Sequence, residues 1–414
     1  MKSTNRKYEN VHMKILSSDD SYKLALKAFA REFEAETGAT IEIVSPPNPH
    51  GWYYLEPLLE ADVFSEDPQF DIFCQNREFA FQIEPHLLPL NSLIEKFDYD
   101  MKEFLKPVYR FDSGMPRHPD TRVGLPIRIL SPFIFYRKDL IKEFPTTWDD
   151  YETMLEEYTG GGKFGLAVEG MAYPYHPFGG VHDLNKVFIA RYLSFGDPMF
   201  TSDWNPLITG EMGVAALEML KRQIDRYASP DWINWGWKEA ADAFLSGKVA
   251  VIETVGTDLL HRLQDSTQSE VVDKWDVGLY PGNGIAPYTI HNMLILKYCK
   301  HPEAAFEFIA YCTGPESARR LYFDYHEQSA RKSVLNSPQA LAKDPSLGTR
   351  VESLERAIPI YLPVPQCYEI EEALWGGVTL STYGYLSAKD ALDYTARRLK
   401  ILFRGNPPVG EYKY

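Results

Sequence analysis

The chain has 414 residues, of which 44% are hydrophobic and 24% are charged, a composition typical of soluble globular proteins with two or three domains. Its formal net charge of −15 argues against nucleic-acid binding, which requires a basic surface, and disfavours long-range attraction of anionic ligands. It has no run of about 18 apolar residues, so we expect no membrane-spanning helix.

The first ten residues carry no apolar signal core. This leaves two possibilities open: an export signal has been removed, or the protein stays inside the cell. The four cysteines, Cys74, Cys299, Cys312 and Cys367, are widely spaced and form no disulfide framework or metal-binding motif. Cys74 and Cys299 lie in strand-like runs, where we expect buried thiols.

The first part of the chain reads as alternating strands and helices. Residues 1–12 resemble a flexible tail, and a strand is expected over 13–16. Tyr22, Leu26, Phe29 and Phe33 then share one face of a helix that ends at Gly38. Further strands are predicted over 40–44 and 70–74.

A central stretch from Val123 to Leu155 has the pattern of a connection between two lobes. Phe133 to Tyr136 is apolar on both faces, which predicts a strand buried between helices in a parallel sheet. Pro126 and Pro132 keep the chain around it extended. Thr147 is expected to cap a new helix, in which Trp148, Tyr151 and Leu155 recur at helical spacing.

The second half repeats this alternation. Strands are predicted near 164–168, 249–252, 275–279 and 293–297. Helices are predicted around 184–195, 217–227 and 388–402, with another helix that holds Phe244 and follows a tryptophan-rich loop at 232–237.

Several motifs resemble those of the extracellular solute-binding proteins of ABC importers, family 1. They include the segments at 33–41, 136–150 (with Tyr-Arg-Lys-Asp-Leu and Pro-Thr-Thr-Trp-Asp-Asp), 246–252 and His301–Phe308, and the resemblance covers about residues 13–404. The chain departs from the family where Arg137 replaces the usual Asn and where His291-Asn292 replace a usual Gly-Gly.

The resemblance implies an α/β fold of the two-lobe, periplasmic-binding-protein-like type II, with three crossings between the lobes near 125–132, 281–288 and 328–333. We expect a tail at 1–12, an N-terminal lobe at 13–128 plus 288–328, and a C-terminal lobe at 129–287 plus 329–414. It also implies a monomer, located in the periplasm or outside the cell and associated with the membrane through the transporter. The expected function is to bind a carbohydrate in the interlobe cleft by hinge closure and deliver it to ABC permease subunits.

Three motifs that could carry chemistry lack the residues that the chemistry needs. Ser329-x-x-Lys332 matches a penicillin-binding-protein motif but has no Ser-Asp-Asn or Lys-Thr-Gly partner. Gly160-Gly-Gly-Lys163 is followed by Phe164 instead of Ser or Thr, which predicts a turn and not a phosphate loop. His176 and His182 have no supporting metal ligands. We therefore predict no catalytic residue, no metal and no cofactor.

Ligand contacts are expected where aromatic and polar residues follow the strands, since ligands of open α/β sheets bind beyond the carboxyl ends of strands. Aromatic rings stack on flat sugar faces, and polar groups bind the hydroxyls. The predicted ligand-binding residues are Asp19, Trp52, Gln75, Asn76, Glu78, Arg128, Tyr175, Trp235, Trp237, Thr254, His291, Asn292, Arg331 and Trp375.

Trp235 and Trp237 lie two residues apart before a helix. We expect one of them, Trp235, to stack on ligand and the other to pack into the second lobe.

Two other functions stay open at this point. A polyamine or another cationic ligand would suit the net charge of −15 and carboxylates such as Asp19 and Glu78. A glycan-acting enzyme would need two carboxylates about 5–9 Å apart. The sequence does not identify the sugar, its length or its linkage.

Overall fold

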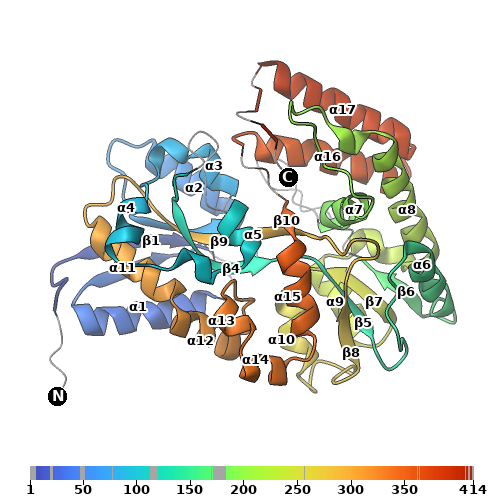
Figure 1. Ribbon diagram of the computed structural model, residues 1–414, viewed down its shortest axis with the longest axis horizontal. Coiled ribbons are helices and arrows are strands. Elements are labelled where there is room, and N and C mark those ends of the chain that lie inside the picture. The colour runs from blue at the N-terminus through green and yellow to red at the C-terminus, as the bar shows by residue number, and fades with distance from the viewer. Residues whose placement is uncertain are drawn as a thin grey trace. The chain divides into compact units, whose positions relative to one another are not determined.

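The computed structural model describes residues 6–18, 22–46, 52–76, 78–111, 120–168, 170, 183–255, 257–360, 362, 364–405, 407–408 and 411–412. The chain divides into two compact units (Figure 1). Unit 1 holds residues 1–129, 289–340 and 362–365, and unit 2 holds residues 130–288, 341–361 and 366–414. Residues 329–340 thus lie in unit 1, whereas the sequence analysis assigned them to the C-terminal lobe.

Unit 1 is built on a mixed sheet with the strand order β9-β3-β1-β2, and β4 also pairs with β9. The first residues of β9, Pro287 and Tyr288, belong to unit 2 and pair with the short β10. The strands of this sheet are β1 (His12–Ser17), β2 (Thr40–Val44), β3 (Ile72–Asn76), β4 (Gly124–Leu130) and β9 (Pro287–Ile295), and β10 (Ile358–Pro359) lies in unit 2. The helices are α1 (Lys23–Thr37), α2 (Trp52–Val63), α3 (Glu78–Gln82), α4 (Asn91–Lys96), α5 (Lys106–Phe111), α11 (Pro302–Thr313), α12 (Pro315–Tyr325), α13 (Lys332–Leu335) and α14 (Pro338–Lys343), with short 3-10 turns at Glu84–His86 and Met101–Glu103.

Helix α1 shows how the apolar spacing in the sequence becomes packing. Leu26, Phe29 and Phe33 are buried on one face, and the ring of Phe33 lies 5.3 Å from that of Phe308 in α11. The helix ends at Gly38, whose φ of 80° lies in the left-handed region and whose N–H donates to the carbonyl of Glu34. The predicted helix and its glycine end are confirmed.

The segment before β1 differs from the predicted flexible tail. Tyr8 is buried, and its ring stacks against Phe33 at 6.3 Å. Its hydroxyl donates to Glu307, 2.5 Å away, and its N–H donates to the carbonyl of Thr37. These contacts hold residues 6–11 against α1 and α11. The physical reason is that the Tyr8 ring is buried against the apolar side chain of Phe33.

Unit 2 has a four-stranded sheet with the order β6-β7-β5-β8. Its strands are β5 (Phe133–Arg137), β6 (Phe164–Ala167), β7 (Val249–Thr254) and β8 (Trp275–Gly278). Its helices are α6 (Trp148–Glu157), α7 (Asp183–Leu193), α8 (Glu211–Tyr227), α9 (Trp237–Leu245), α10 (Thr257–Leu263), α15 (Leu347–Arg356), α16 (Cys367–Thr382) and α17 (Ala388–Gly405), with 3-10 turns at Leu207–Thr209 and Pro230–Asn234.

Strand β5 is buried as predicted, but the predicted parallel pairing is wrong. It runs antiparallel to both β7 and β8, and only β6 and β7 pair in parallel. An apolar run reports burial of both faces of a strand and carries no information on the direction of its neighbours. The next prediction is confirmed, because Thr147 caps α6 by accepting the N–H of Asp150.

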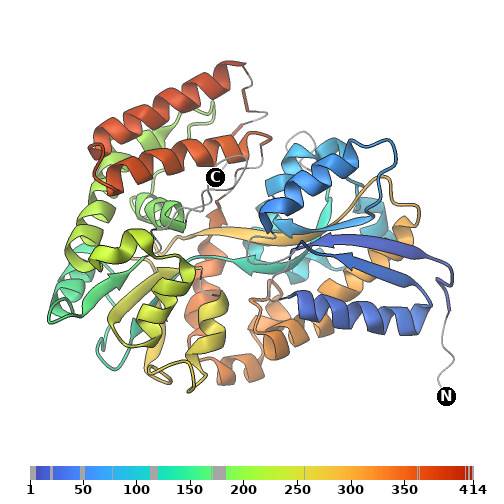
Figure 2. The ribbon, with the colours of Figure 1, turned by 180° about the vertical axis from the view of Figure 1, so that it is seen from behind.

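Helices α16 and α17 lie side by side in unit 2 (Figures 1 and 2). A Cβ on Gly377 would stand 2.2 Å from the hydroxyl oxygen of Thr395, so only glycine allows this approach. The Thr395 hydroxyl donates to the carbonyl of Ala373 across the contact. The C-terminal helix predicted over 388–402 is thus a packed element of unit 2.

Candidate ligand-binding site

The carboxyl ends of β1 and β3 lie beside the middle of β9 in the unit 1 sheet. β1 and β3 run in parallel, with Ser17 beside Cys74. β9 runs antiparallel to β3, with Gln75 beside Asn292 and Asn76 beside His291. The carboxyl ends of β1 and β3 and the His291-Asn292 pair therefore lie close together, where the sequence analysis expected ligand contacts.

Arg128, on β4, lies at the centre of a buried polar cluster at these strand ends. Its Nη1 donates to Oε2 of Glu327 at 3.0 Å, and its Nη2 lies 3.3 Å from Nε2 of His291. The guanidinium also lies over the ring of Tyr22, 4.7 Å from the ring centroid. Arg128 and Glu327 are 5% and 1% exposed, so the pair is almost fully removed from water.

Tyr22 links the remaining members of the cluster. Its hydroxyl lies 2.7 Å from the Ser18 hydroxyl and 3.5 Å from Nδ1 of His291. The rings of Tyr22 and His291 meet edge to face, with centroids 5.7 Å apart. The Tyr22 hydroxyl also donates to the carbonyl of Cys74 at 3.5 Å. Tyr22 is thus held by Ser18, His291 and Cys74, which fixes the orientation of its ring.

The cluster combines hydrogen-bond donors and acceptors with a net formal charge of zero. The guanidinium is balanced by the Glu327 carboxylate, and the hydroxyls of Ser18 and Tyr22 and the His291 imidazole supply both donors and acceptors. Across the described part of the chain, no group of three or more His, Cys, Asp or Glu side chains could hold a metal ion. The cluster is thus a buried, charge-balanced group at the carboxyl ends of β1 and β3.

Arg331 lies outside this cluster. Its Nε donates to the carbonyl of Thr313 at 2.6 Å, its Nη1 pairs with Glu103 at 2.8 Å, and its Nη2 donates to the Tyr99 hydroxyl at 2.7 Å. The guanidinium also stacks on Phe104 at 4.3 Å. These contacts tie the segment that precedes α13 to the 3-10 turn at Met101–Glu103, which is a structural role within unit 1.

In unit 2, Thr254 is the last residue of β7 and is buried beside Phe133 of β5. Gly236 caps α9, so Trp235 and Trp237 flank a helix start as predicted. Neither tryptophan packs into the core, since Trp235 is half-buried and Trp237 is 44% exposed. The buried tryptophan is instead Trp232, whose ring meets Tyr383 edge to face at 5.5 Å.

Trp235 has a structural role through its backbone as well. Its carbonyl accepts the N–H of Gly170 at 2.8 Å, just after β6. A Cβ on Gly170 would stand 2.2 Å from the carbonyl oxygen of Trp232. The tryptophan loop is therefore fixed against the carboxyl end of β6, which places it at the expected edge of the unit 2 sheet.

The remaining predicted ligand-binding residues can be placed by their position in the chain. Asp19 and Tyr175 lie outside the described residues. Trp52 begins α2, Gln75 and Asn76 end β3, and Glu78 begins α3, but their side chains are not among those described. Trp375 lies in the middle of α16 and is half-buried.

Sequence reasoning missed Ser18, Tyr22 and Glu327. Tyr22 had been placed on the apolar face of α1, although it precedes that helix. Glu327 follows His326, which ends α12 in the left-handed conformation, and it lies just ahead of the predicted crossing at 328–333. Its position beside a predicted crossing was the signal that the sequence offered.

Residues 28–349 match the family described as bacterial extracellular solute-binding protein. The chain belongs to this family. Its members bind solutes and are not enzymes, and the family is extracellular. No described helix is both long enough and apolar enough to span a membrane. No curated protein sequence matches the chain.

Solved structures of solute-binding proteins share the fold of this family member over nearly its whole length. Maltose-bound MalE3 of T. maritima is 19% identical, with a TM-score of 0.78 over 95% of this chain and 100% of that chain. The ribitol complex of an ABC transporter solute-binding protein from Agrobacterium radiobacter K84 is also 19% identical, with a TM-score of 0.77 over 95% and 99%. An ABC substrate-binding protein from Listeria monocytogenes in complex with cycloalternan is 19% identical, with a TM-score of 0.74 over 96% and 100%. The predicted fold class, an α/β two-lobe binding protein, is confirmed; the three crossings stay a prediction.

Proposed function

We propose that this solute-binding protein is the substrate-binding component of an ABC importer and that its ligand is a neutral carbohydrate or polyol. The observation that carries the proposal is the charge-neutral cluster around Arg128 at the strand ends of unit 1. A neutral ligand leaves the Arg128–Glu327 pair balanced, whereas a charged ligand would need a group of opposite charge beside it.

The half-buried and exposed tryptophans of unit 2 support the same chemistry. Trp235 and Trp237 offer apolar faces near the carboxyl end of β6, and such faces stack on sugar rings. We infer that the ligand takes hydroxyl contacts from the cluster in unit 1 and ring contacts from unit 2. A ligand that contacts both units favours a closed arrangement, which is the hinge closure expected of this family.

The named ligands of the structural relatives, ribitol and maltose among them, fall in the same chemical class. By the same inference the protein works outside the cytoplasm as a monomer, and it meets permease subunits at the membrane. A polyamine would instead place cationic groups beside Arg128 and would require carboxylates that the described cluster does not supply beyond Glu327.

The test is a thermal-shift screen against neutral sugars and polyols, with spermidine and putrescine as cationic comparators. A ligand at 100 times its dissociation constant should stabilise the protein by about 2.7 kcal/mol. Stabilisation by a sugar or polyol that persists at high salt supports the proposal. Stabilisation by polyamines alone, lost as salt is raised, would assign the site to a cationic ligand.

A further inference from the structure

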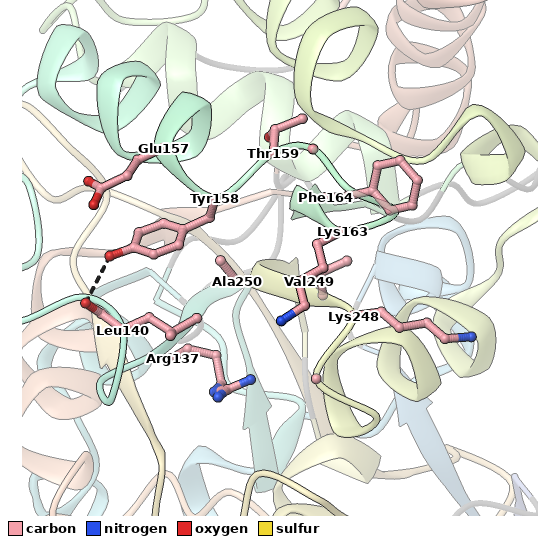
Figure 3. Close-up of a pocket in the computed structure, with 12 residues that line it drawn as sticks. Arg137, Leu140, Glu157, Tyr158, Thr159, Lys163, Phe164, Lys248, Val249 and Ala250 are labelled. Atoms are coloured by element: carbon pink, nitrogen blue, oxygen red, sulfur yellow. Dashed lines mark hydrogen bonds between the residues drawn. The ribbon is translucent and has the colours of Figure 1, made fainter.

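Unit 2 contains a cavity at the edge of its sheet where the parallel strands begin (Figure 3). Its volume is about 380 Å³, within the range of small-molecule sites. Phe164 opens β6 and Val249 opens β7 on its wall, and Arg137 ends β5, which runs the other way. The cavity is therefore one strand length, about 15–20 Å, from Thr254 at the carboxyl end of β7.

The charge of this cavity is opposite to that of the whole chain. Its lining includes Arg137, Lys163 and Lys248 but only one carboxylate, that of Glu157, in a protein with a net charge of −15. In Figure 3 the Lys163 ammonium points toward Arg137, whereas the Glu157 carboxylate lies at the far margin. With Asp139, whose carboxylate pairs with Arg137, the charged groups are Arg137, Lys163 and Lys248 against Asp139 and Glu157, which leaves a local net charge of +1.

Arg137 is held in place at the cavity by neighbours on both sides. Its Nε and Nη2 donate to the two carboxylate oxygens of Asp139, at 2.6 and 2.5 Å. Its Nη1 lies 3.2 Å from the position that a Cβ on Gly247 would take, and Gly247 itself lines the cavity. The Asp139 pair orients the guanidinium, and Nη1 takes no part in that pair.

Lys163 reaches the cavity from a tight glycine turn. Gly160 and Lys163 exchange both backbone hydrogen bonds, at 2.9 and 3.0 Å. The three glycines between β6 and α6 all have positive φ, so the turn needs them. This segment does not have the sequence of a phosphate loop, but its lysine and Arg137 line the same cavity.

The other walls are apolar or aromatic. Leu140, Phe164 and Val249 line the cavity together with Tyr158, whose hydroxyl donates to the carbonyl of Leu140 at 2.8 Å. A ligand of this cavity would therefore combine an anionic group with an apolar body.

We propose that this cavity is a second small-molecule site, which binds an organic anion through Arg137 and Lys163. The shared chemistry is a carboxylate or phosphate on a ring or short apolar body. The site lies in one unit, at the opposite sheet edge from the strand ends near Thr254, so its occupation does not depend on the carbohydrate proposal. It also gives a role to Arg137, the residue that departs from the family motif.

Calorimetric titration of the full chain with phenyl phosphate and with benzoate tests the proposal, with benzyl alcohol as the neutral analogue. At least one of the two anions should bind saturably and benzyl alcohol at least tenfold more weakly. Hydrogen–deuterium exchange with the bound anion should slow in segments 158–164 and 247–250. Absence of saturable anion binding, or equal binding of the alcohol, would overturn the assignment.

Three variants locate the binding. Lys163→Gln and Arg137→Asn should each weaken anion binding at least tenfold, because each removes one of the two cationic groups. Lys400→Gln makes the same charge change on an exposed part of α17 and should leave the affinity within twofold. Equal losses in the Lys400 and Lys163 variants would show that net charge alone attracts the anion. Melting curves of each variant confirm that the fold is intact, and unchanged anion binding by both site variants would overturn the proposal.

Discussion

Arg128 and Glu327 form an ion pair in which Nη1 and Oε2 are 3.0 Å apart and both side chains are almost wholly buried. The two residues are 199 positions apart in the sequence, yet both lie in unit 1. A charge left alone in such a place is costly, because the protein interior solvates it poorly. Loss of either partner should therefore destabilise the fold and leave the cluster with a net charge.

Replacing Arg128 by Met should lower the free energy of unfolding by roughly 3–5 kcal/mol, since Glu327 is left buried without its guanidinium. The double variant Arg128→Met, Glu327→Leu should recover a large part of that loss. Urea unfolding of the wild type, both single variants and the double variant measures this as a double-mutant cycle. Additive losses would contradict a direct pairing.

The same double variant separates folding from ligand recognition. It should fold and yet bind the best sugar or polyol at least tenfold more weakly, because the cluster loses its guanidinium and carboxylate. Arg331→Met with Glu103→Leu is a matched control, since that pair lies outside the cluster. Ligand affinity in the control should stay within about threefold of the wild type.

Trp235 and Trp237 are expected to contribute ring contacts with ligand. Replacing the stacking residue by Ala should cost roughly 1–3 kcal/mol of binding, while the melting temperature without ligand hardly moves. Trp232→Ala is the contrasting variant: its buried ring should cost roughly 3–5 kcal/mol of stability. Unchanged binding in both the Trp235 and Trp237 variants would remove this loop from the site.

Glu32 in α1 pairs with Arg320 in α12, and this contact should make the stability of the fold depend on pH in the acid range. Hydrogen bonds from Arg320 and Tyr311 lower the pKa of the Glu32 carboxyl to about 2. A depressed pKa stabilises the fold at pH values above the unfolded pKa of about 4.5, and that stabilisation is lost as the pH falls toward 2. Because the pair is partly exposed, the effect should be below about 1 kcal/mol.

Unfolding of wild type and Glu32→Gln at pH 6 and pH 2.5 measures this contribution. The difference in stability between the two proteins should shrink at the lower pH. A difference that grows on acidification would contradict the assigned pKa direction.

All four cysteines lie in the described part of the chain, are buried and form no disulfide there. Burial raises the pKa of the Cys299 thiol to about 12, which removes the reactive thiolate at neutral pH. Ellman's reagent should therefore label the native protein slowly and all four thiols in 6 M guanidinium. Rapid labelling of one or more thiols in the native state would show that the burial is incomplete.

The strands and helices of both units were predictable because apolar spacing and end residues report burial locally, as Gly38 and Thr147 demonstrate. The direction of β5 was not, since pairing with β7 and β8 joins residues over 100 positions apart. Only part of the candidate site could be predicted from the sequence. His291 and Asn292 stood out as a departure from a motif, whereas Tyr22 and Glu327 became cluster members only through long-range contacts.

The most direct test of the central claim is calorimetric titration of the wild type with the neutral sugar or polyol that stabilises it most, at 20 mM and at 500 mM salt. Binding to a charge-neutral cluster should be saturable, with one site per chain, and the dissociation constant should change by less than about threefold between the two salts. Small-angle scattering of the same samples should show a smaller radius of gyration with ligand. If no neutral sugar or polyol binds, while spermidine binds and weakens steeply with salt, the account of this protein as a carbohydrate-binding component is contradicted.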